Sequence, residues 1–128
     1  MSTLNDFDFT GKVILIVEDT ETSNRFYNAA LSRTKAKLLW AVDGEEALTR
    51  LKANKDIDVV LLDLNLPGIS GFDVLKNIRK TNSKLSVIVQ TAYVLSGEEN
   101  ACYELGANDF ITKPIMLDQL LSSLQKHF

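Results

Sequence analysis

Short apolar runs that each lead to a polar or charged residue are the feature that most constrains the fold. The runs cover residues 13–17, 59–62, 87–89 and 110–111, and they lead to Glu18, Asp19, Asp63, Thr91 and Lys113. Buried parallel strands read as continuous apolar runs of this length, and open parallel sheets bind ligands beyond the carboxyl ends of their strands. We therefore expect three carboxylates, a hydroxyl and an ammonium group to converge at one edge of a parallel sheet.

Segments with helical spacing separate these runs. Helices are expected at about 22–33, from 44, from 72, at about 96–105 and from 117. Thr20 or Thr22 is a plausible N-cap of the first helix, and Gly106 is typical of the residue that follows a helix. Residues 37–41 resemble a further, less apolar strand at a sheet edge. Alternating strands and helices without a long linker predict an α/β fold with a doubly wound sheet.

The expected cluster of charges is electrostatically incomplete. Carboxylates about 4 Å apart would repel by about 4 kcal/mol per pair at the effective dielectric near a protein surface. Lys113 alone cannot offset three of them. An oxygen-only set of this kind suits Mg²⁺, which keeps positions for water and phosphate oxygens. Asp63 stands alone at its strand end, whereas Glu18 and Asp19 form a pair, so Asp63 is the best candidate for a nucleophile that forms an acyl phosphate.

Bulk properties agree with one small domain and exclude several classes of function. The 128 residues carry a net charge of −3, which argues against a dedicated nucleic-acid binder. The single cysteine, Cys102, fits a reducing compartment. No apolar stretch is long enough to span a membrane, and the N-terminus does not resemble a signal peptide. The sequence therefore predicts a cytoplasmic protein without direct membrane contact.

Four motifs, in order along the chain, resemble the receiver domain of two-component response regulators. They are Ile-Val-Glu-Asp at 16–19, Asp-Leu-Asn-Leu-Pro-Gly-Ile-Ser-Gly at 63–71, Gln-Thr-Ala at 90–92 and Gly-Ala-Asn-Asp-Phe-Ile-Thr-Lys-Pro at 106–114. Residues 8–12 and 20–25 are most similar to receivers attached to hybrid histidine kinases. The resemblance implies a flavodoxin-like five-stranded sheet in the order 2-1-3-4-5. It places a polar leader at 1–10 and the receiver at 11–128.

The resemblance also implies a role for each site residue. The phosphoacceptor is Asp63, and the lysine facing the phosphoryl group is Lys113. The Mg²⁺ ligands are Glu18, Asp19, Asp63 and the backbone carbonyl of Asn65. The switch residues are Thr91 and Phe110. Pro114 implies a cis bond after Lys113. Phe110 lacks a hydroxyl, so its switching would work by packing alone. The resemblance further implies that Thr91 swings toward the phosphoryl oxygens and that Phe110 then rotates inward.

The expected function is phosphorylation-dependent signalling without catalytic turnover of an external substrate. The donor would be a phosphohistidine on a histidine kinase or histidine phosphotransfer domain, and the output a changed face of the fourth helix, fifth strand and fifth helix that contacts a downstream protein. The donor is expected to dock near Asn24, Phe26 and Ile115. Asn65 and Tyr93 are expected to tune the lifetime of the acyl phosphate.

Other functions have a weaker basis in the sequence. A phosphohydrolase of the haloacid-dehalogenase type needs a second aspartate two residues after the nucleophile, where this chain has Asn65. A nucleotide- or flavin-binding domain would carry a phosphate-binding loop after its first strand, where the acidic residues 18–21 would repel phosphate. A phosphorylation-independent pseudo-receiver that acts as an interaction module stays open as the alternative. The chain is either a stand-alone receiver or part of a longer protein.

Overall fold

A parallel sheet of five strands forms the centre of the computed structural model, which describes residues 7–92 and 97–128. The strands are β1 (Val13–Val17), β2 (Lys37–Ala41), β3 (Val59–Asp63), β4 (Ser86–Thr91) and β5 (Asp109–Thr112). They lie in the order β2-β1-β3-β4-β5. Both the doubly wound fold and the strand order that the resemblance implied are confirmed, and β2 lies at an edge as expected.

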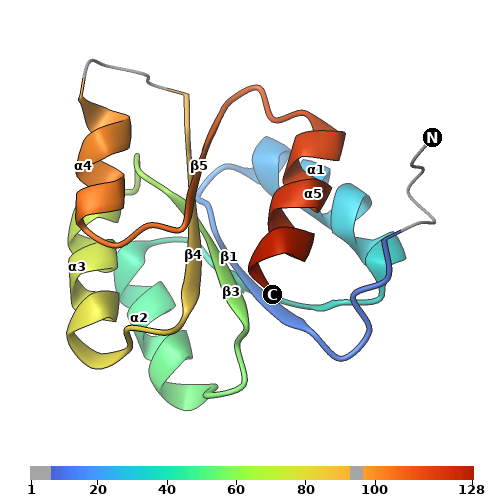
Figure 1. Cartoon of the computed structure of the whole chain (residues 1–128), viewed down its shortest axis with the longest axis horizontal. Helices are drawn as coiled ribbons and strands as arrows, with labels where there is room; N and C mark the ends of the chain where they lie inside the picture. Colours follow the sequence, from blue (N-terminus) through green and yellow to red (C-terminus); the bar gives the residue numbers. More distant parts are fainter. Residues whose placement is uncertain (1–6, 93–96) are drawn as a thin grey trace.

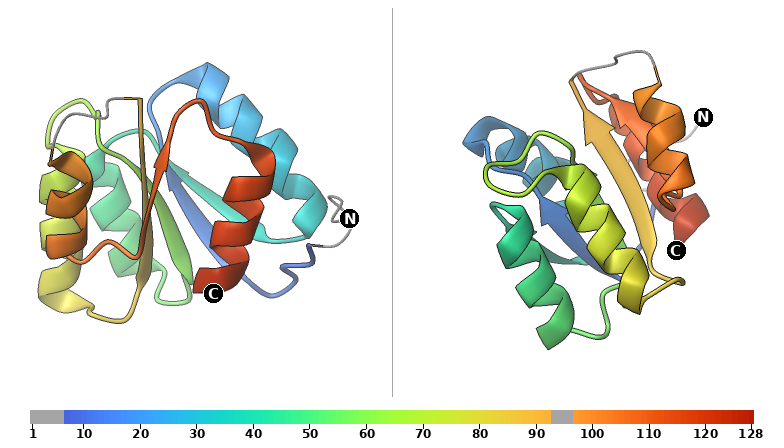
Figure 2. Two further views of the ribbon diagram at one scale, coloured as in Figure 1. Left: turned by 45° about the horizontal axis from the view of Figure 1, so that its top comes forward. Right: turned by 90° about the vertical axis from the view of Figure 1, so that its left-hand side faces the viewer.

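Helices cover both faces of the sheet (Figures 1 and 2). They are α1 (Glu21–Leu31), α2 (Gly44–Ala53), α3 (Gly71–Thr81), α4 (Glu98–Glu104) and α5 (Leu117–His127), with a short 3-10 helix, η2 (Ser32–Thr34), after α1. Helices α1 and α5 lie on one side of the sheet, and α2, α3 and α4 lie on the other. Among the described residues, no helix is long and apolar enough to cross a lipid bilayer.

The ends of two helices differ from the expectation. Helix α1 stops at Leu31, and the chain tightens into η2 where the sequence suggested a continuous helix to about 33. Thr20 occupies the N-cap position of α1, but its side chain makes no capping hydrogen bond. Helix α4 begins at Glu98, after the undescribed residues 93–96. Gly106, just beyond α4, has the left-handed φ of 105° that favours glycine, which confirms its expected role.

Alternation along the strands divides the apolar interior in two. Leu15, Val60 and Val87 belong to the cluster on the side of α2, α3 and α4. Ile16, Leu61 and Ile88 belong to the cluster on the side of α1 and α5. Because successive side chains of a strand point to opposite faces, the residues two positions later return to the same face. Glu18, Asp63 and Gln90 therefore continue the rows that face α1 and α5.

Aromatic residues near both ends of the chain pack together. Phe7 and Phe9 are buried in the cluster on the α1 and α5 side, and the ring centroids of Phe9 and Phe128 are 4.7 Å apart. The backbone N–H of Phe9 donates to the carbonyl of Thr34. The expected domain limits stay a prediction, but the aromatic residues of the expected leader pack against the domain as well as against each other.

Candidate functional site

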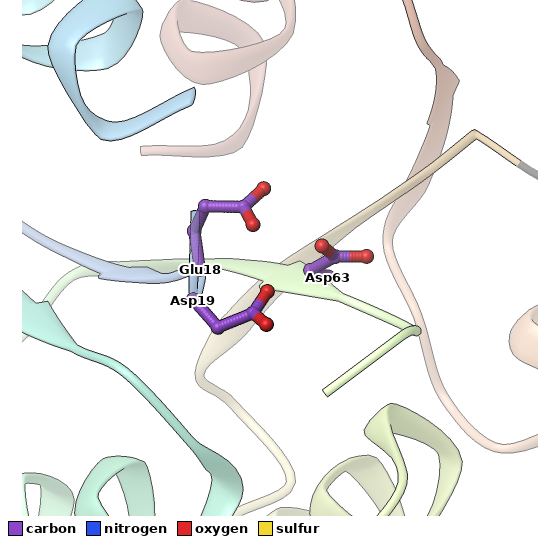
Figure 3. Close-up of side chains that lie close together, drawn as sticks. All are labelled: Glu18, Asp19 and Asp63. Carbon is purple, nitrogen blue, oxygen red and sulfur yellow. The ribbon is translucent and has the colours of Figure 1, made fainter. Parts of the chain in front are cut away.

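Two neighbouring strands bring the acidic residues together. Glu18 and Asp19 follow β1, and Asp63 is the last residue of β3, which pairs with β1 so that Val17 lies opposite Leu62. One carboxylate oxygen from each of Glu18, Asp19 and Asp63 lies within 4.8 Å of the others. Figure 3 shows Glu18 and Asp19 leaving the end of β1 on opposite sides, with Asp63 beside them. The expected convergence of three carboxylates is therefore present.

The three carboxylates differ in exposure, and the pKa values of Glu18 and Asp63 are shifted in opposite directions. Asp19 is exposed, whereas Glu18 is fully buried and Asp63 is 4% exposed. Burial, together with the charge of Glu18, raises the pKa of Asp63 above its ordinary value. The hydrogen bond from the N–H of Asn65 and the charge of Lys113 act in the opposite direction but do not outweigh this rise. Burial alone would also raise the pKa of Glu18, but the hydrogen bond and charge of Lys113 outweigh it and keep that pKa lowered.

Lys113 supplies the positive charge of the cluster. Its Nζ lies 2.5 Å from Oε1 of Glu18 and 3.3 Å from Oδ2 of Asp63. Burial would lower the pKa of Lys113, but its hydrogen bond to Glu18 and the charge of Asp63 raise it, so the side chain stays an ammonium ion. The backbone N–H of Lys113 donates to the carbonyl of Thr91 at 2.8 Å, and the bond to Pro114 is cis, as expected.

Asn65 and Thr91 complete the edge of the site. The backbone N–H of Asn65 donates to Oδ1 of Asp63 at 3.0 Å, and its Nδ2 lies 3.5 Å from Oγ1 of Thr91. Thr91 is fully buried at the end of β4. The structure thus places both residues next to the acidic cluster. A ligand role for the carbonyl of Asn65 stays a prediction.

A glycine lets α3 start directly against the end of β3. The backbone N–H of Gly71 donates to the carbonyl of Leu64, and a Cβ at Gly71 would lie 2.5 Å from the carbonyl oxygen of Asp63. Any side chain at this position would push the helix away from the strand. Gly71 therefore fixes the backbone that carries Asp63.

The remaining expected residues differ in their exposure. Phe110 is 7% exposed and packs in the cluster on the α2, α3 and α4 side, so this conformation already holds the aromatic ring inside. Its inward rotation stays a prediction. In the expected docking area, Phe26 is 36% exposed and Ile115 is half-buried, while Nδ2 of Asn24 donates to the carbonyl of Glu18. Tyr93 lies outside the described residues.

Two residues beside the site, Tyr27 and Gln90, have no role predicted from the sequence, although Gln90 belongs to the motif at 90–92. The hydroxyl of Tyr27 donates to Oε1 of Gln90, and both side chains are 1% exposed. A usable signal existed, because Gln90 interrupts an otherwise apolar run directly before Thr91. A polar side chain inside a buried strand requires a hydrogen-bond partner, and Tyr27 supplies it.

The chemistry of these donors fits a hard divalent cation. The cluster offers carboxylate oxygens and no sulfur or imidazole ligand, which is the set that Mg²⁺ and Mn²⁺ accept. Three carboxylates against one ammonium group leave an excess of negative charge. Glu18, Asp19 and Asp63 are thus the residues that could hold a metal ion.

Comparisons with known proteins agree with this geometry. The family model described as response regulator receiver domain matches residues 14–125. An uncharacterized transcriptional regulatory protein, YkoG of Bacillus subtilis, is 37% identical over 112 residues, which cover 88% of this chain and 49% of that protein. The sensor histidine kinase RcsC of Escherichia coli is 34% identical over 112 residues, which cover 88% of this chain and 12% of the kinase. The chain thus spans about half or less of the length of these relatives.

Solved structures show the same fold. The signal receiver domain of a putative Luxo repressor protein from Vibrio parahaemolyticus superposes with a TM-score of 0.85 at 29% identity, covering 91% of this chain and 88% of that one. The Mn²⁺-bound form of response regulator Rcp1 superposes with a TM-score of 0.76 at 30% identity, covering 90% of each chain. The second neighbour has a divalent metal bound.

Proposed function

The chain belongs to the family of response regulator receiver domains, and from that premise we propose that it is a phosphorylation-dependent signalling domain that accepts a phosphoryl group on Asp63. The observation that carries the proposal is the approach of carboxylate oxygens of Glu18, Asp19 and Asp63 to within 4.8 Å of one another, beside the ammonium group of Lys113. Glu18 and Asp63 are buried, and buried charge that is only partly neutralised is costly for the fold, which supports a functional reason for the cluster. A metal ion and a phosphoryl group together would complete the cluster.

Asp63 is the nucleophile of the proposed reaction. An oxygen of its carboxylate attacks the phosphorus atom of a phosphohistidine, a carboxylate–phosphorus bond forms, and the phosphorus–nitrogen bond breaks with its electron pair leaving on the imidazole. Mg²⁺, when bound by Glu18, Asp19, Asp63 and the carbonyl of Asn65, supplies positive charge to the phosphoryl oxygens. The N–H of Asn65 orients the Asp63 carboxylate through Oδ1. Lys113 stays charged and approaches the same group from the side of β5.

The proposed output is a change in the face formed by α4, β5 and α5. Phosphoryl oxygens on Asp63 would offer the Thr91 hydroxyl a new acceptor, and only such a differential contact can shift a conformational equilibrium. Thr91 and Phe110 lie on the neighbouring strands β4 and β5, so a shift of one residue reaches the other through the sheet. Thr91→Ala is expected to reduce spectral changes across about 91–115 when beryllofluoride is added.

The proposed partners follow from the chemistry and from the relatives. A histidine kinase or histidine phosphotransfer domain would donate the phosphoryl group, and RcsC gives an example of a similar segment within a sensor histidine kinase. The readout would be contact with a downstream protein, without nucleic acid or direct membrane contact. Self-assistance in phosphorylation and dephosphorylation, and a cytoplasmic location, belong to the same proposal.

Intact-mass analysis after incubation with acetyl phosphate tests the assignment. Wild type should gain one phosphoryl group when Mg²⁺ or Mn²⁺ is present and none after chelation. Asp63→Asn should gain none, whereas Asp73→Asn, which alters an exposed carboxylate on α3, should behave as wild type. Labelling that persists in Asp63→Asn would contradict the assignment, and a wild type that never labels would favour the pseudo-receiver.

A further inference from the structure

A buried hydrogen-bonded pair lies beside the acidic cluster and is not used by the proposed phosphoryl transfer. Tyr27 projects from α1, and its hydroxyl donates to Oε1 of Gln90 on β4. Both side chains are 1% exposed. The bond therefore ties the helix on one side of the sheet to a central strand, across 63 positions of sequence.

The register of the sheet places Gln90 next to the phosphoacceptor. Gln90 lies opposite Asp63 in the pairing of β3 with β4. Leu61 and Ile88, two residues earlier, both face α1 and α5, so Asp63 and Gln90 share that face as neighbours. The carbonyl of Gln90 also accepts the N–H of Leu64, the residue after Asp63. Gln90 is thus connected to the end of β3 through its backbone and to α1 through its side chain.

The electrostatic field of the site reaches Tyr27. Burial raises the pKa of Tyr27, and the negative charges of Glu18 and Asp63 raise it further. The phenol therefore stays protonated and acts as a donor, and its hydroxyl dipole responds to the charge on the two carboxylates. Any change in that charge alters the energy of its bond to Gln90.

Gln90 keeps one unused hydrogen-bonding group. Its Nε2 is buried and has no hydrogen-bond partner among the described residues. A buried amide donor without an acceptor is unfavourable, and an apolar residue of the same size would avoid the penalty. An apolar pair could therefore stabilise the fold better than Tyr27 and Gln90 do. A role in the neighbouring site explains better why this position holds a polar pair.

We propose that Tyr27 and Gln90 are a positioning pair that transmits the state of Asp63 to α1. The inference rests on the proposed function, because α1 carries Asn24 and Phe26 in the proposed docking area of the phosphodonor. A phosphoryl group on Asp63 would change the negative charge near the Tyr27 hydroxyl. It would also offer a hydrogen-bond acceptor to Thr91, the residue after Gln90 on β4. Both effects act on the hydrogen bond that the Tyr27 hydroxyl donates to Gln90 on β4. The placement of α1 then depends on whether Asp63 is occupied, and by linkage a donor bound to α1 affects Asp63 in return.

The chain contains its own reporter for the position of α1. Trp40, its single tryptophan, lies on β2 and lines a hollow of about 270 Å³ with α1 residues that include Asn24 and Asn28. A shift of α1 relative to the sheet changes the polar groups around the indole. We therefore expect the fluorescence of Trp40 to report a movement of α1, the helix that carries Tyr27.

The test compares wild type with Tyr27→Phe, Gln90→Met and the double variant, each saturated with Mg²⁺ before beryllium and fluoride are added. Fluorine NMR measures how much beryllofluoride is bound, and Trp40 emission is compared at equal occupancy. Wild type should show an emission change, and the double variant should retain less than half of it. The double variant should recover the stability that either single variant loses, because replacing both partners with apolar groups of similar shape leaves nothing unsatisfied.

Separate outcomes distinguish this inference from the proposed function. Thr49→Val removes a side-chain hydrogen bond on α2, away from α1, and should keep the full emission change. An unchanged Trp40 response in the double variant at equal occupancy overturns the inference, as does a wild type that binds beryllofluoride without any change in emission. In both cases bound beryllofluoride leaves the proposed function standing. A wild type with no bound fluorine signal overturns both.

Discussion

Two polar clusters at opposite ends of the same sheet are satisfied in opposite ways. At the amino-terminal edge of the strands, the guanidinium of Arg79 donates to the carbonyls of Asn82, Leu85 and Gly106 and to Oδ1 of Asn108. At the carboxyl-terminal edge, three carboxylates share one ammonium group. The first cluster matches one cation to neutral acceptors from two segments of the chain, 82–85 and 106–108, whereas the second leaves negative charge unmatched.

The difference shows that the Arg79 cluster maintains the fold, whereas the acidic cluster is the proposed functional site, which the fold supports. Arg79 joins the end of α3 to the segments that lead into β4 and β5, so its hydrogen bonds hold three elements together. Asp63 lies in surroundings that disfavour its own charge, and its raised pKa records that cost. Removing the side chain of Arg79 should therefore destabilise the protein, whereas removing the charge of Asp63 should stabilise the metal-free protein.

The largest expected effect is the loss of the Arg79 network. Arg79→Leu takes the guanidinium donors away from the carbonyls of Leu85, which is buried, and Gly106, which is half-buried, and it should lower the free energy of unfolding by about 3 kcal/mol. Urea denaturation measures the change. Arg50→Leu alters an exposed arginine on α2 and should stay within about 0.5 kcal/mol of wild type. A loss for Arg79→Leu as small as that of Arg50→Leu would remove the structural side of the comparison.

A smaller effect of opposite sign is expected at the phosphoacceptor. Asp63→Asn removes a buried charge that repels Glu18, and it should raise the stability of the metal-free protein at neutral pH. The folded pKa of Asp63 is raised, so its destabilising effect is complete above that pKa. The effect disappears as the pH falls below the ordinary value of 3.8.

Denaturation of both proteins at several pH values in the presence of a chelator checks this prediction. The difference between Asp63→Asn and wild type should shrink steadily as the medium is acidified. A variant that is less stable than wild type at neutral pH would show that Asp63 contributes to the fold and does not burden it.

The sequence predicts the strands and the position of the acidic cluster well because both depend on local patterns. A continuous apolar run such as 59–62 predicts a buried parallel strand, and the residue after it falls at the edge where ligands bind. The pairing of side chains within the site cannot be predicted from local patterns. Whether Lys113 pairs with Glu18 or with Asp63 depends on side-chain geometry across 95 and 50 positions of sequence. The Tyr27–Gln90 bond spans 63 positions and has no local signature at Tyr27.

Mg²⁺ should act on one cluster and not on the other. At a concentration ten times its Kd, a ligand that binds only the folded state adds about 1.4 kcal/mol to stability. Asp19→Asn should lose most of this gain, because the exposed carboxylate of Asp19 is not committed to Lys113. Glu18→Gln should lose less, since Glu18 already holds the ammonium group at 2.5 Å.

Thermal denaturation with and without Mg²⁺ provides the measurement, and Arg79→Leu is the matched control because it should keep the whole increment on a lower baseline. Equal Mg²⁺ increments for Asp19→Asn and wild type would exclude Asp19 as a ligand.

The smallest expected effect compares the starts of two helices. The Ser70 hydroxyl caps α3 by accepting the N–H of Asp73 at 3.2 Å, whereas the Thr20 hydroxyl before α1 donates to Oε2 of Glu18 instead of capping its helix. Ser70→Ala should therefore cost about 1 kcal/mol of stability, as the loss of an N-cap does. Thr20→Val should stay within about 0.5 kcal/mol, because α1 loses no cap and the carboxylate of Glu18 retains both Lys113 and the backbone N–H of residue 20. Urea denaturation of both variants in the presence of a chelator measures these changes. If Thr20→Val loses more stability than Ser70→Ala, then α1 depends on the acidic site for its stability. The acidic cluster would then also maintain the fold, and the contrast with the Arg79 cluster would no longer hold.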